Sequence, residues 1–407
     1  MRRSASASLP DFAPLPTMDT QRFLSRKIVD MPRSGIREFF DLCAGSKDII
    51  SLGVGEPDFV TPWNIREAAI FSLEKGHTTY TSNYGLLSLR EAIAAYVGSF
   101  FGVGYDPTCE ILPTVGVSEA IDLALRCLLN PGDEVIYHEP VYVSYAPTVQ
   151  MADGVAVPVQ TGIEDLFALN PDKLEAAITP RTKVLMLNFP TNPTGSIAPL
   201  ETLTRIAEIC VKHDIFVLTD EIYSELRYDG VRHTSIASLP GMKERTLLLH
   251  GFSKAFAMTG FRLGYCCGPK ELIEMMCKIH SYTMICPTIT SQEAGIEALR
   301  NGQSAMHEMR DSYHIRRDYI VKRFNDIGMD CHLPGGAFYT FPSIRRFGLS
   351  SKEFALRLLK EHKVAAVPGT AFGPCGEGYL RCCYATAFSL LEQACDKMAR
   401  FCDSLKA

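Results

Sequence analysis

The sequence predicts an α/β protein in which a mostly parallel central sheet, flanked by helices, is joined to a smaller α+β domain. Between about residues 60 and 300, short apolar runs alternate with helical patterns, which is typical of parallel strands joined by crossover helices. The chain has 407 residues, more than a single core usually holds, so more than one domain is expected. The last third differs from the middle and predicts long helices around a short strand.

The central sheet is predicted from six short apolar runs, four of which end in polar residues. They span residues 134–137, 155–159, 184–188, 216–219, 247–250 and 263–266. Between two of these runs, residues 199–212 carry proline in the first turn and a single apolar stripe. This pattern predicts a crossover helix.

The C-terminal third predicts helices over 270–300 and 307–325, then a short strand after the turn at Gly335-Gly336. The expected organisation is a disordered leader (1–25), an N-terminal segment packing with the small domain (26–58), a large α/β domain (59–300) and a small α+β domain (301–407). The leader contains Arg and Ser but no apolar core of signal-peptide length, and an organelle transit peptide is the alternative.

Composition favours a small molecule as the partner. The 41 basic and 46 acidic residues give a net charge of -5, which recommends neither nucleic acid nor a membrane surface, and no run of roughly 18 apolar residues occurs. The 14 cysteines form no C-x-x-C motif and the ten histidines no H-x-x-x-H motif, so no metal site is expected. Free thiols in the cytoplasm are the best interpretation.

Polar residues follow three of the predicted strands. Because ligands bind at the carboxyl ends of parallel strands, these residues are candidates for one site. They are Asn192 after VLMLN, Asp220 and Tyr223 after IFVLT, and Ser253 and Lys254 after TLLLH, with Arg262 eight residues further on.

This set meets the requirements of pyridoxal phosphate (PLP). Lys254 supplies an amine for the imine, and Asp220 supplies an anion that keeps the pyridine nitrogen protonated. Tyr223 and Asn192 can donate hydrogen bonds to the phenolate oxygen, and Arg262 can pair with the phosphate. The sequence therefore predicts a PLP enzyme.

The second half of the phosphate site is predicted at TVGVSEA (114–120), directly before the amphipathic stretch 120–129. The backbone N–H groups there, including those of Val117 and Ser118, lie at a helix N-terminus, where a dianion is stabilised.

The motifs NFPTNPTG, DEIYSEL, GFSKAFAMTGFRLGY and Tyr379-Leu380-Arg381 resemble those of class I/II aminotransferases, which are PLP enzymes of fold type I. The resemblance begins near residue 25 and covers nearly the whole remaining chain. It implies that Lys254 carries the cofactor, that Asp220 pairs with the pyridine nitrogen, and that Tyr223 and Asn192 contact the phenolate. It also implies that Arg262, Ser118, Val117 and Ser253 belong to the cofactor site.

Four further roles follow from the resemblance. Tyr142 matches the aromatic residue that stacks on the cofactor ring, and Tyr80 the tyrosine that reaches the phosphate in the neighbouring subunit. Gly55 matches a glycine whose backbone meets the substrate carboxylate, and Arg381 the arginine that binds that carboxylate. The chain departs from the family at Gly251, where serine is frequent, so one hydroxyl to the phosphate is missing.

The function implied is transfer of an amino group from an L-amino acid to a 2-oxo acid by a ping-pong mechanism in a homodimer with shared active sites. 2-Oxoglutarate is a candidate acceptor. Two alternatives remain: a PLP-dependent lyase or synthase on the same fold, and a non-catalytic PLP-sensing domain of a regulator. The roughly 25 residues before the resemblance are too few for a helix-turn-helix domain.

The class of amino-acid donor is predicted from the absence of a cation that could bind a second substrate carboxylate. Dicarboxylate substrates need a second cation, but residues 280–287 lack arginine and the phosphate loop offers Ser118. Tyr282, Met284 and Ile36 suggest a partly apolar pocket, so neutral or aromatic amino acids are expected to be better donors than aspartate. Candidates for a cation that would serve 2-oxoglutarate are Arg22, Arg33 and Arg37.

Overall fold

A computed structural model of the protein describes residues 18–31, 35 and 48–405. The chain forms two compact units, residues 1–32 and 33–407. In the first unit, a short 3-10 helix η1 (Gln21–Phe23) and helix α1 (Arg26–Val29) have exposed side chains. Most of the predicted leader, residues 1–17, lies outside the described residues, as do Arg33, Ile36 and Arg37.

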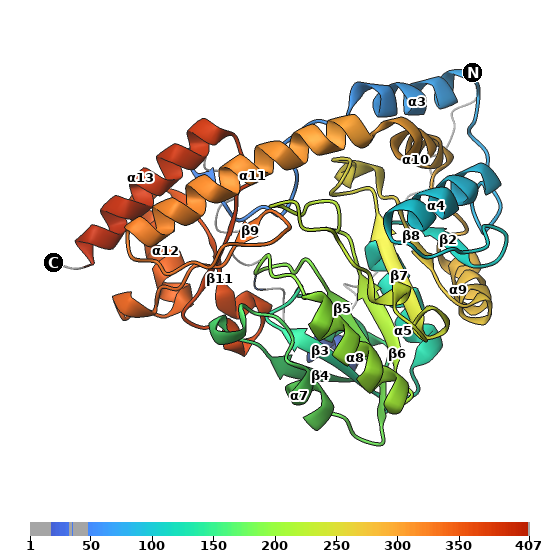
Figure 1. Ribbon diagram of the computed structural model, residues 1–407, viewed down its shortest axis with the longest axis horizontal. Helices are drawn as coiled ribbons and strands as arrows, with labels where there is room; N and C mark the ends of the chain where they lie inside the picture. The colour runs from blue at the N-terminus through green and yellow to red at the C-terminus, as the bar shows by residue number, and fades with distance from the viewer. Residues whose placement is uncertain (1–17, 32–34, 36–47, 406–407) are drawn as a thin grey trace, which may run out of the picture. The chain divides into compact units, whose positions relative to one another are not determined.

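The second unit is built on a seven-stranded sheet, counted over the residues described (Figure 1). All strands run in one direction except β8, which is antiparallel to both of its neighbours. The predicted α/β fold with a mostly parallel sheet is therefore confirmed. In sheet order the strands are β2 (Ile111–Thr114), β8 (Gly264–Cys267), β7 (Thr246–Gly251), β6 (Phe216–Asp220), β5 (Thr182–Asn188), β3 (Glu134–Glu139) and β4 (Val155–Gln160).

Helices cover both faces of this sheet, because side chains alternate along each buried strand. In β5, Val184 and Met186 pack with helices α5 (Val117–Leu128), α6 (Tyr145–Met151) and α9 (Lys270–Thr283). Leu185 and Leu187 face the opposite way, toward α7 (Pro171–Ala176) and α8 (Leu200–Lys212). Helices α4 (Leu87–Phe100) and α10 (Ile289–Asn301) contribute to the core that contains Leu248 of β7, and α10 packs on α3 (Trp63–Glu74).

One sequence prediction about these elements was wrong, and one strand was not predicted. The helix predicted over 270–300 is two helices, α9 and α10, because Pro287 has no N–H to continue the first and Ile285 has a φ of 68°. Strand β2 was missed because it is short and contains Pro113; as an edge strand, it tolerates a residue that cannot donate to a neighbour.

The smaller α+β domain contains a three-stranded antiparallel sheet, in the order β11 (Val367–Pro368), β12 (Leu380–Cys383), β9 (Tyr339–Thr340). Helix α12 (Ser351–His362) packs against β11 and α13 (Phe388–Ser404). Strand β1 (Ile50–Ser51) pairs in parallel with β10 (Val364–Ala365), so this short strand contacts the C-terminal part of the chain. Helix α11 (Gln303–Asp326) contacts α10 and also packs against α13 (Figure 1).

Among the described residues, no helix is long and apolar enough to cross a membrane, and no group of three or more His, Cys, Asp or Glu side chains could hold a metal ion. Every cysteine that the structure describes is a free thiol.

Candidate active site

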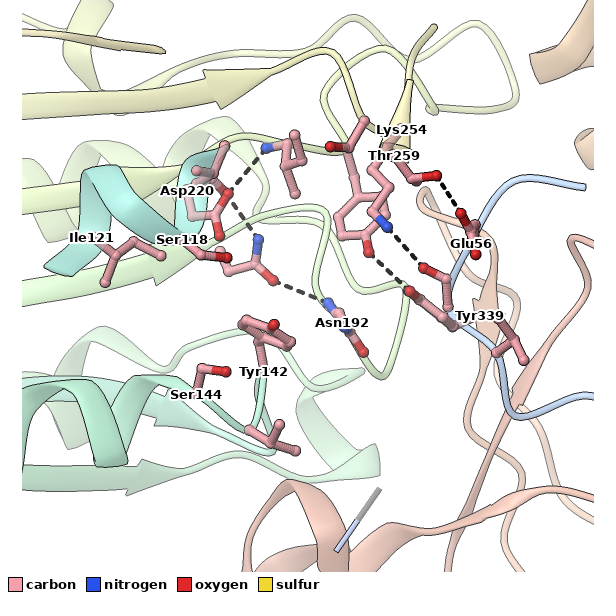
Figure 2. A pocket seen from close by; sticks show the side chains of 18 of the residues that line it. Glu56, Ser118, Ile121, Tyr142, Ser144, Asn192, Asp220, Lys254, Thr259 and Tyr339 are labelled. Carbon is pink, nitrogen blue, oxygen red and sulfur yellow. Dashed lines mark hydrogen bonds between the residues drawn. The ribbon is translucent and has the colours of Figure 1, made fainter. Parts of the chain in front are cut away.

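A cavity of about 650 Å³ lies at the carboxyl ends of β5, β6 and β7 and reaches β9 and β12 of the smaller sheet. Figure 2 shows Asp220, Ser118 and Tyr142 on one side, Tyr339 and Glu56 on the other, and Lys254 between them. Of the predicted site residues, those that line the cavity are Gly55, Val117, Ser118, Tyr142, Asn192, Asp220, Tyr223, Ser253, Lys254, Arg262 and Arg381. Tyr80 does not line it, and 78% of Tyr80 is exposed in this single chain.

Lys254 follows β7 and extends its amine into the cavity. Its Nζ donates a hydrogen bond to the carbonyl oxygen of Gly55 at 2.8 Å. Burial lowers the pKa of the Lys254 ammonium to about 8, because a charged amine is poorly solvated there. A neutral amine, which can act as a nucleophile or a base, is therefore available near neutral pH.

Asp220 ends β6 and is 6% exposed. Tyr145 of α6 donates a hydrogen bond to its Oδ2 at 2.7 Å, and the backbone N–H of Ile222 donates to its Oδ1 at 3.2 Å. Burial nevertheless raises the pKa of Asp220 to about 6. A buried carboxylate of this kind is stabilised by a cationic partner, and a protonated pyridine nitrogen is such a partner.

Tyr223 is a buried phenol beside the smaller sheet. Burial raises its pKa, so Tyr223 keeps its proton and can donate a hydrogen bond. Its hydroxyl lies 2.9 Å from the hydroxyl of Tyr339 in β9. This hydrogen bond joins the part built on the seven-stranded sheet to the smaller α+β domain.

Arg381 of β12 is 2% exposed and is held from two sides. Its Nη1 donates to Oδ1 of Asn192 at 3.0 Å, and its Nη2 donates to the carbonyl oxygen of Gly53 at 2.5 Å. Its Nε is buried and has no hydrogen-bond partner among the described residues. A buried guanidinium with an unsatisfied donor is suited to bind a carboxylate.

Glycines bring the N-terminus of α5 close to Arg262. Gly116, directly before α5, has a φ of 76°, and a Cβ there would lie 2.7 Å from Nη2 of Arg262. A Cβ on Gly264 would lie 2.6 Å from the backbone nitrogen of Val117. Backbone N–H groups, the Ser118 hydroxyl and a guanidinium therefore converge where a phosphate dianion can bind.

The packing around residue 251 explains why this chain has glycine where serine is frequent in the family. A Cβ at this position would come within 3.0 Å of the Gly264 Cα and 3.2 Å of Cγ2 of Val117. The close packing of β7 against β8 and α5 favours glycine there.

Sequence reasoning missed three residues that organise the site. Tyr145 bonds Asp220, Tyr339 bonds Tyr223, and Asn188 joins two site residues by donating to the carbonyl of Asp220 at 2.9 Å and accepting from the N–H of Asn192 at 3.0 Å. Asn188 ends a predicted strand and Tyr339 lies in the short strand predicted after the turn at Gly335-Gly336, so their positions in the sequence could have marked them as site candidates. Tyr145 lies on a helix, and its sequence context carries no such signal.

The residues suggested for an apolar pocket do not line this cavity. Tyr282 is 84% exposed and Met284 is 51% exposed in this chain. In this single chain the two side chains do not enclose the cavity, because α9 ends on the surface here, and their place in a substrate pocket stays a prediction. Ile36 lies outside the described residues.

The donor set matches one cofactor. An amine, a buried carboxylate that requires a cation, a phenol and a glycine-lined anion site beside a guanidinium together fit the amine, ring nitrogen, phenolate and phosphate contacts of PLP. The fold and the site thus define a PLP-dependent enzyme.

Comparison with known proteins specifies the family. Residues 47–398 match the family model for aminotransferase class I and II, and the chain belongs to this family of PLP-dependent transferases. Aromatic-amino-acid aminotransferase 2 of Thermococcus litoralis is 46% identical over 379 residues, covering 93% of this chain and 97% of the relative. An aspartate aminotransferase of Pyrococcus abyssi is 48% identical over 369 residues, covering 90% and 95%. The crystal structure of an aromatic aminotransferase from Pyrococcus horikoshii OT3 superimposes with a TM-score of 0.87 at 46% identity, covering 91% and 99%.

Proposed function

We propose that this aminotransferase moves an amino group from a neutral or aromatic L-amino acid to a 2-oxo acid by a ping-pong mechanism, with 2-oxoglutarate as a candidate acceptor. The observation that carries the proposal is the presence in one cavity of the Lys254 amine and the buried, partly unsatisfied guanidinium of Arg381. An α-amino acid offers one amine and one carboxylate to such a pair. The aminotransferase relatives support transfer over the lyase or synthase alternative.

On the cofactor side, PLP supplies an electron-withdrawing ring that stabilises negative charge at the substrate's α-carbon. In our proposal Asp220 keeps the ring nitrogen protonated, while Tyr142 stacks on the ring. Tyr223 and Asn192 donate to the phenolate oxygen; because Oδ1 of Asn192 accepts from Arg381, its amide nitrogen is left to donate. The phosphate is held by Ser118, Ser253, the N–H of Val117 and Arg262.

On the substrate side, Arg381 binds the α-carboxylate and Lys254 transfers the proton from the α-carbon. The guanidinium of Arg381 is oriented by Asn192 and Gly53 before substrate arrives, so little ordering is needed on binding. Lys254 is neutral above about pH 8 and then has a free electron pair for the proton.

The donor class follows from the charges around the cavity. Among the described residues that line it, the cations are Lys254, Arg262 and Arg381, and each has a role above. A distal carboxylate would also meet Glu56. The named relatives include aromatic and aspartate aminotransferases at nearly equal identity, 46% and 48%, so the donor class rests on the site. Of the candidates for an additional cation, Arg22 is exposed, and the other two lie outside the described residues.

We further propose a homodimer with shared active sites, acting in the cytoplasm. The exposed Tyr80 supports the first point, because a tyrosine that serves a partner's phosphate site is exposed in its own chain. The free thiols of the described cysteines suit a reducing compartment.

The proposal is tested by mixing the PLP-loaded enzyme with single amino acids in the absence of any oxo acid and recording the visible spectrum of the cofactor. Phenylalanine, methionine and alanine should each remove the visible absorbance of bound PLP. Addition of 2-oxoglutarate afterwards should restore that absorbance. An absorbance that no amino acid discharges, or that is lost only when both substrates are present, contradicts the ping-pong proposal.

A further inference from the structure

Residues 53–59, which we name the strap, have no regular structure, and residues 54–56 of the strap line the cavity. All residues from 52 to 62 are described, and none belongs to a helix or strand. The strap nevertheless supplies two carbonyl oxygens to the site: Gly53 accepts from Arg381 and Gly55 accepts from Lys254. Since no ladder of backbone hydrogen bonds fixes the strap, its position depends on these two carbonyl contacts and on the contacts made by its side chains.

The most enclosed charged contact of the strap joins Asp58 to Arg316 of α11. Nη1 of Arg316 lies 2.8 Å from both carboxylate oxygens of Asp58, and the two side chains are 10% and 25% exposed. The Arg316 guanidinium also lies over the rings of Phe59 and Tyr313, at 5.2 and 5.5 Å. An ion pair sheltered in this way is stronger than one on an open surface.

Aromatic contacts continue from this pair to the catalytic groups. Phe59 packs edge-on against Tyr313, Tyr313 lies 5.6 Å from Phe338, and Phe338 is in contact with Tyr223 and Tyr339. The Tyr339 hydroxyl approaches Gly55 so closely that a Cβ there would lie 2.5 Å away. The ion pair and the carbonyls of the strap therefore belong to one packed unit.

We propose that Asp58 and Arg316 are positioning residues for the substrate carboxylate. This inference rests on the proposed function, and it assigns the two residues to the substrate side of the site. Their ion pair holds the strap so that the Gly53 carbonyl fixes the plane of the Arg381 guanidinium, and Arg381 lines the cavity. The phosphate contacts proposed for PLP come from α5 and the chain after β7, so the pair should affect binding of a substrate carboxylate much more than binding of the cofactor.

The test uses Asp58→Asn, Arg316→Gln and the double variant. Asp396→Asn is the matched control, because it breaks an ion pair of 2.6 Å between Arg323 of the same helix and α13. Two dissociation constants are measured: that of PLP for the apoprotein, and that of 3-phenylpropanoate, a carboxylate without an amino group, for the loaded enzyme. The second constant is read from the cofactor's difference spectrum, so no turnover is involved.

The dissociation constant of 3-phenylpropanoate should rise about tenfold in each single variant and by no more in the double variant, because the partners act as one unit. That of PLP should stay within about twofold, and the control should match the wild type. Arg316→Lys, which keeps a charged donor, should recover most of the affinity.

The inference is overturned by unchanged 3-phenylpropanoate binding, by a parallel loss of PLP and 3-phenylpropanoate, or by effects that add in the double variant. A loss in Arg316→Lys equal to that in Arg316→Gln also overturns it. If the wild-type enzyme takes no amino group from any amino acid, the proposed function fails instead. If it does so while the variants bind 3-phenylpropanoate normally, only the role of the ion pair fails.

Discussion

Tyr145 donates a hydrogen bond of 2.7 Å to Asp220, although the two residues are 75 positions apart in the chain. The bond favours the ionised form of a carboxylate whose pKa burial raises to about 6. Asp220 therefore loses its charge, and with it the attraction for a protonated ring nitrogen, as the pH falls through about 6.

Tyr145→Phe should move this transition to higher pH, since removing the donor raises the pKa of Asp220 further. The affinity of the apoprotein for PLP, measured by fluorescence between about pH 5 and 8, should begin to fall at a higher pH than in the wild type. Tyr105→Phe is the control, because the Tyr105 hydroxyl is buried and meets no hydrogen-bond partner in the described part of the chain. Identical pH profiles for Tyr145→Phe and the wild type would contradict this prediction.

Lys254 should control the pH dependence of the first half-reaction. Because the neutral amine accepts the proton and burial lowers the Lys254 pKa to about 8, the rate should rise with pH and level off above that value. Stopped-flow absorbance at saturating amino acid measures it. A rate that stays constant from about pH 6 to 10 would rule out a titrating lysine base.

Lys254→Ala should still bind PLP but without a covalent bond, because the phosphate and ring contacts remain. Borohydride reduction followed by mass spectrometry should place the cofactor on Lys254 in the wild type and on no lysine in the variant. The transfer rate should fall by at least about a thousandfold. An adduct on another lysine of the wild type would refute the assignment.

Gly116→Ala should weaken PLP binding by about tenfold. The new methyl group would lie 2.7 Å from Nη2 of Arg262 and would require a positive φ, so it displaces the guanidinium from the N-terminus of α5. Gly102→Ala is the matched control, because Gly102 also has a positive φ, of 74°, while its Cβ would meet no described atom within 4 Å. Equal PLP dissociation constants for the two variants would argue against the phosphate site proposed here.

Hybrid enzymes should reveal whether Tyr80 serves a neighbouring subunit. If it does, mixing inactive Lys254→Ala with a weakened Tyr80→Phe variant yields hybrid dimers with one site rebuilt from intact halves and one doubly defective site. Activity should therefore rise above the sum of the separate variants. A fully active monomer in analytical ultracentrifugation would refute the shared site.

Donor preference is checked by kcat/KM for phenylalanine, methionine, alanine and aspartate with a common oxo acid. The neutral donors should exceed aspartate, because the described lining of the cavity offers a distal carboxylate no unassigned cation and places Glu56 nearby. If aspartate exceeds all three by about a hundredfold, roughly 2.7 kcal/mol of transition-state preference, the inference from charge is wrong.

The sequence by itself determined the fold class and the position of the candidate site. Apolar runs of strand length and the polar residues that end them are local patterns, and parallel strands bring those ends to one edge whatever the remaining packing. Lys254, Asp220 and Asn192 could be collected in this way. The break between α9 and α10 was missed because the apolar pattern of residues 270–300 continues past Pro287. The edge strand β2 was missed because it is short and contains a proline.

Only the tertiary structure decided which groups hold these residues in place. Tyr145 reaches Asp220 from a helix, Asp58 meets Arg316 across 258 positions, and the Gly53 carbonyl accepts from Arg381 across 328 positions. No local pattern encodes such pairs, because a backbone carbonyl has no sequence signal and an Asp or Arg has many potential partners. Which partner each group meets is fixed by how the helices and the two sheets pack, a property of the whole folded chain.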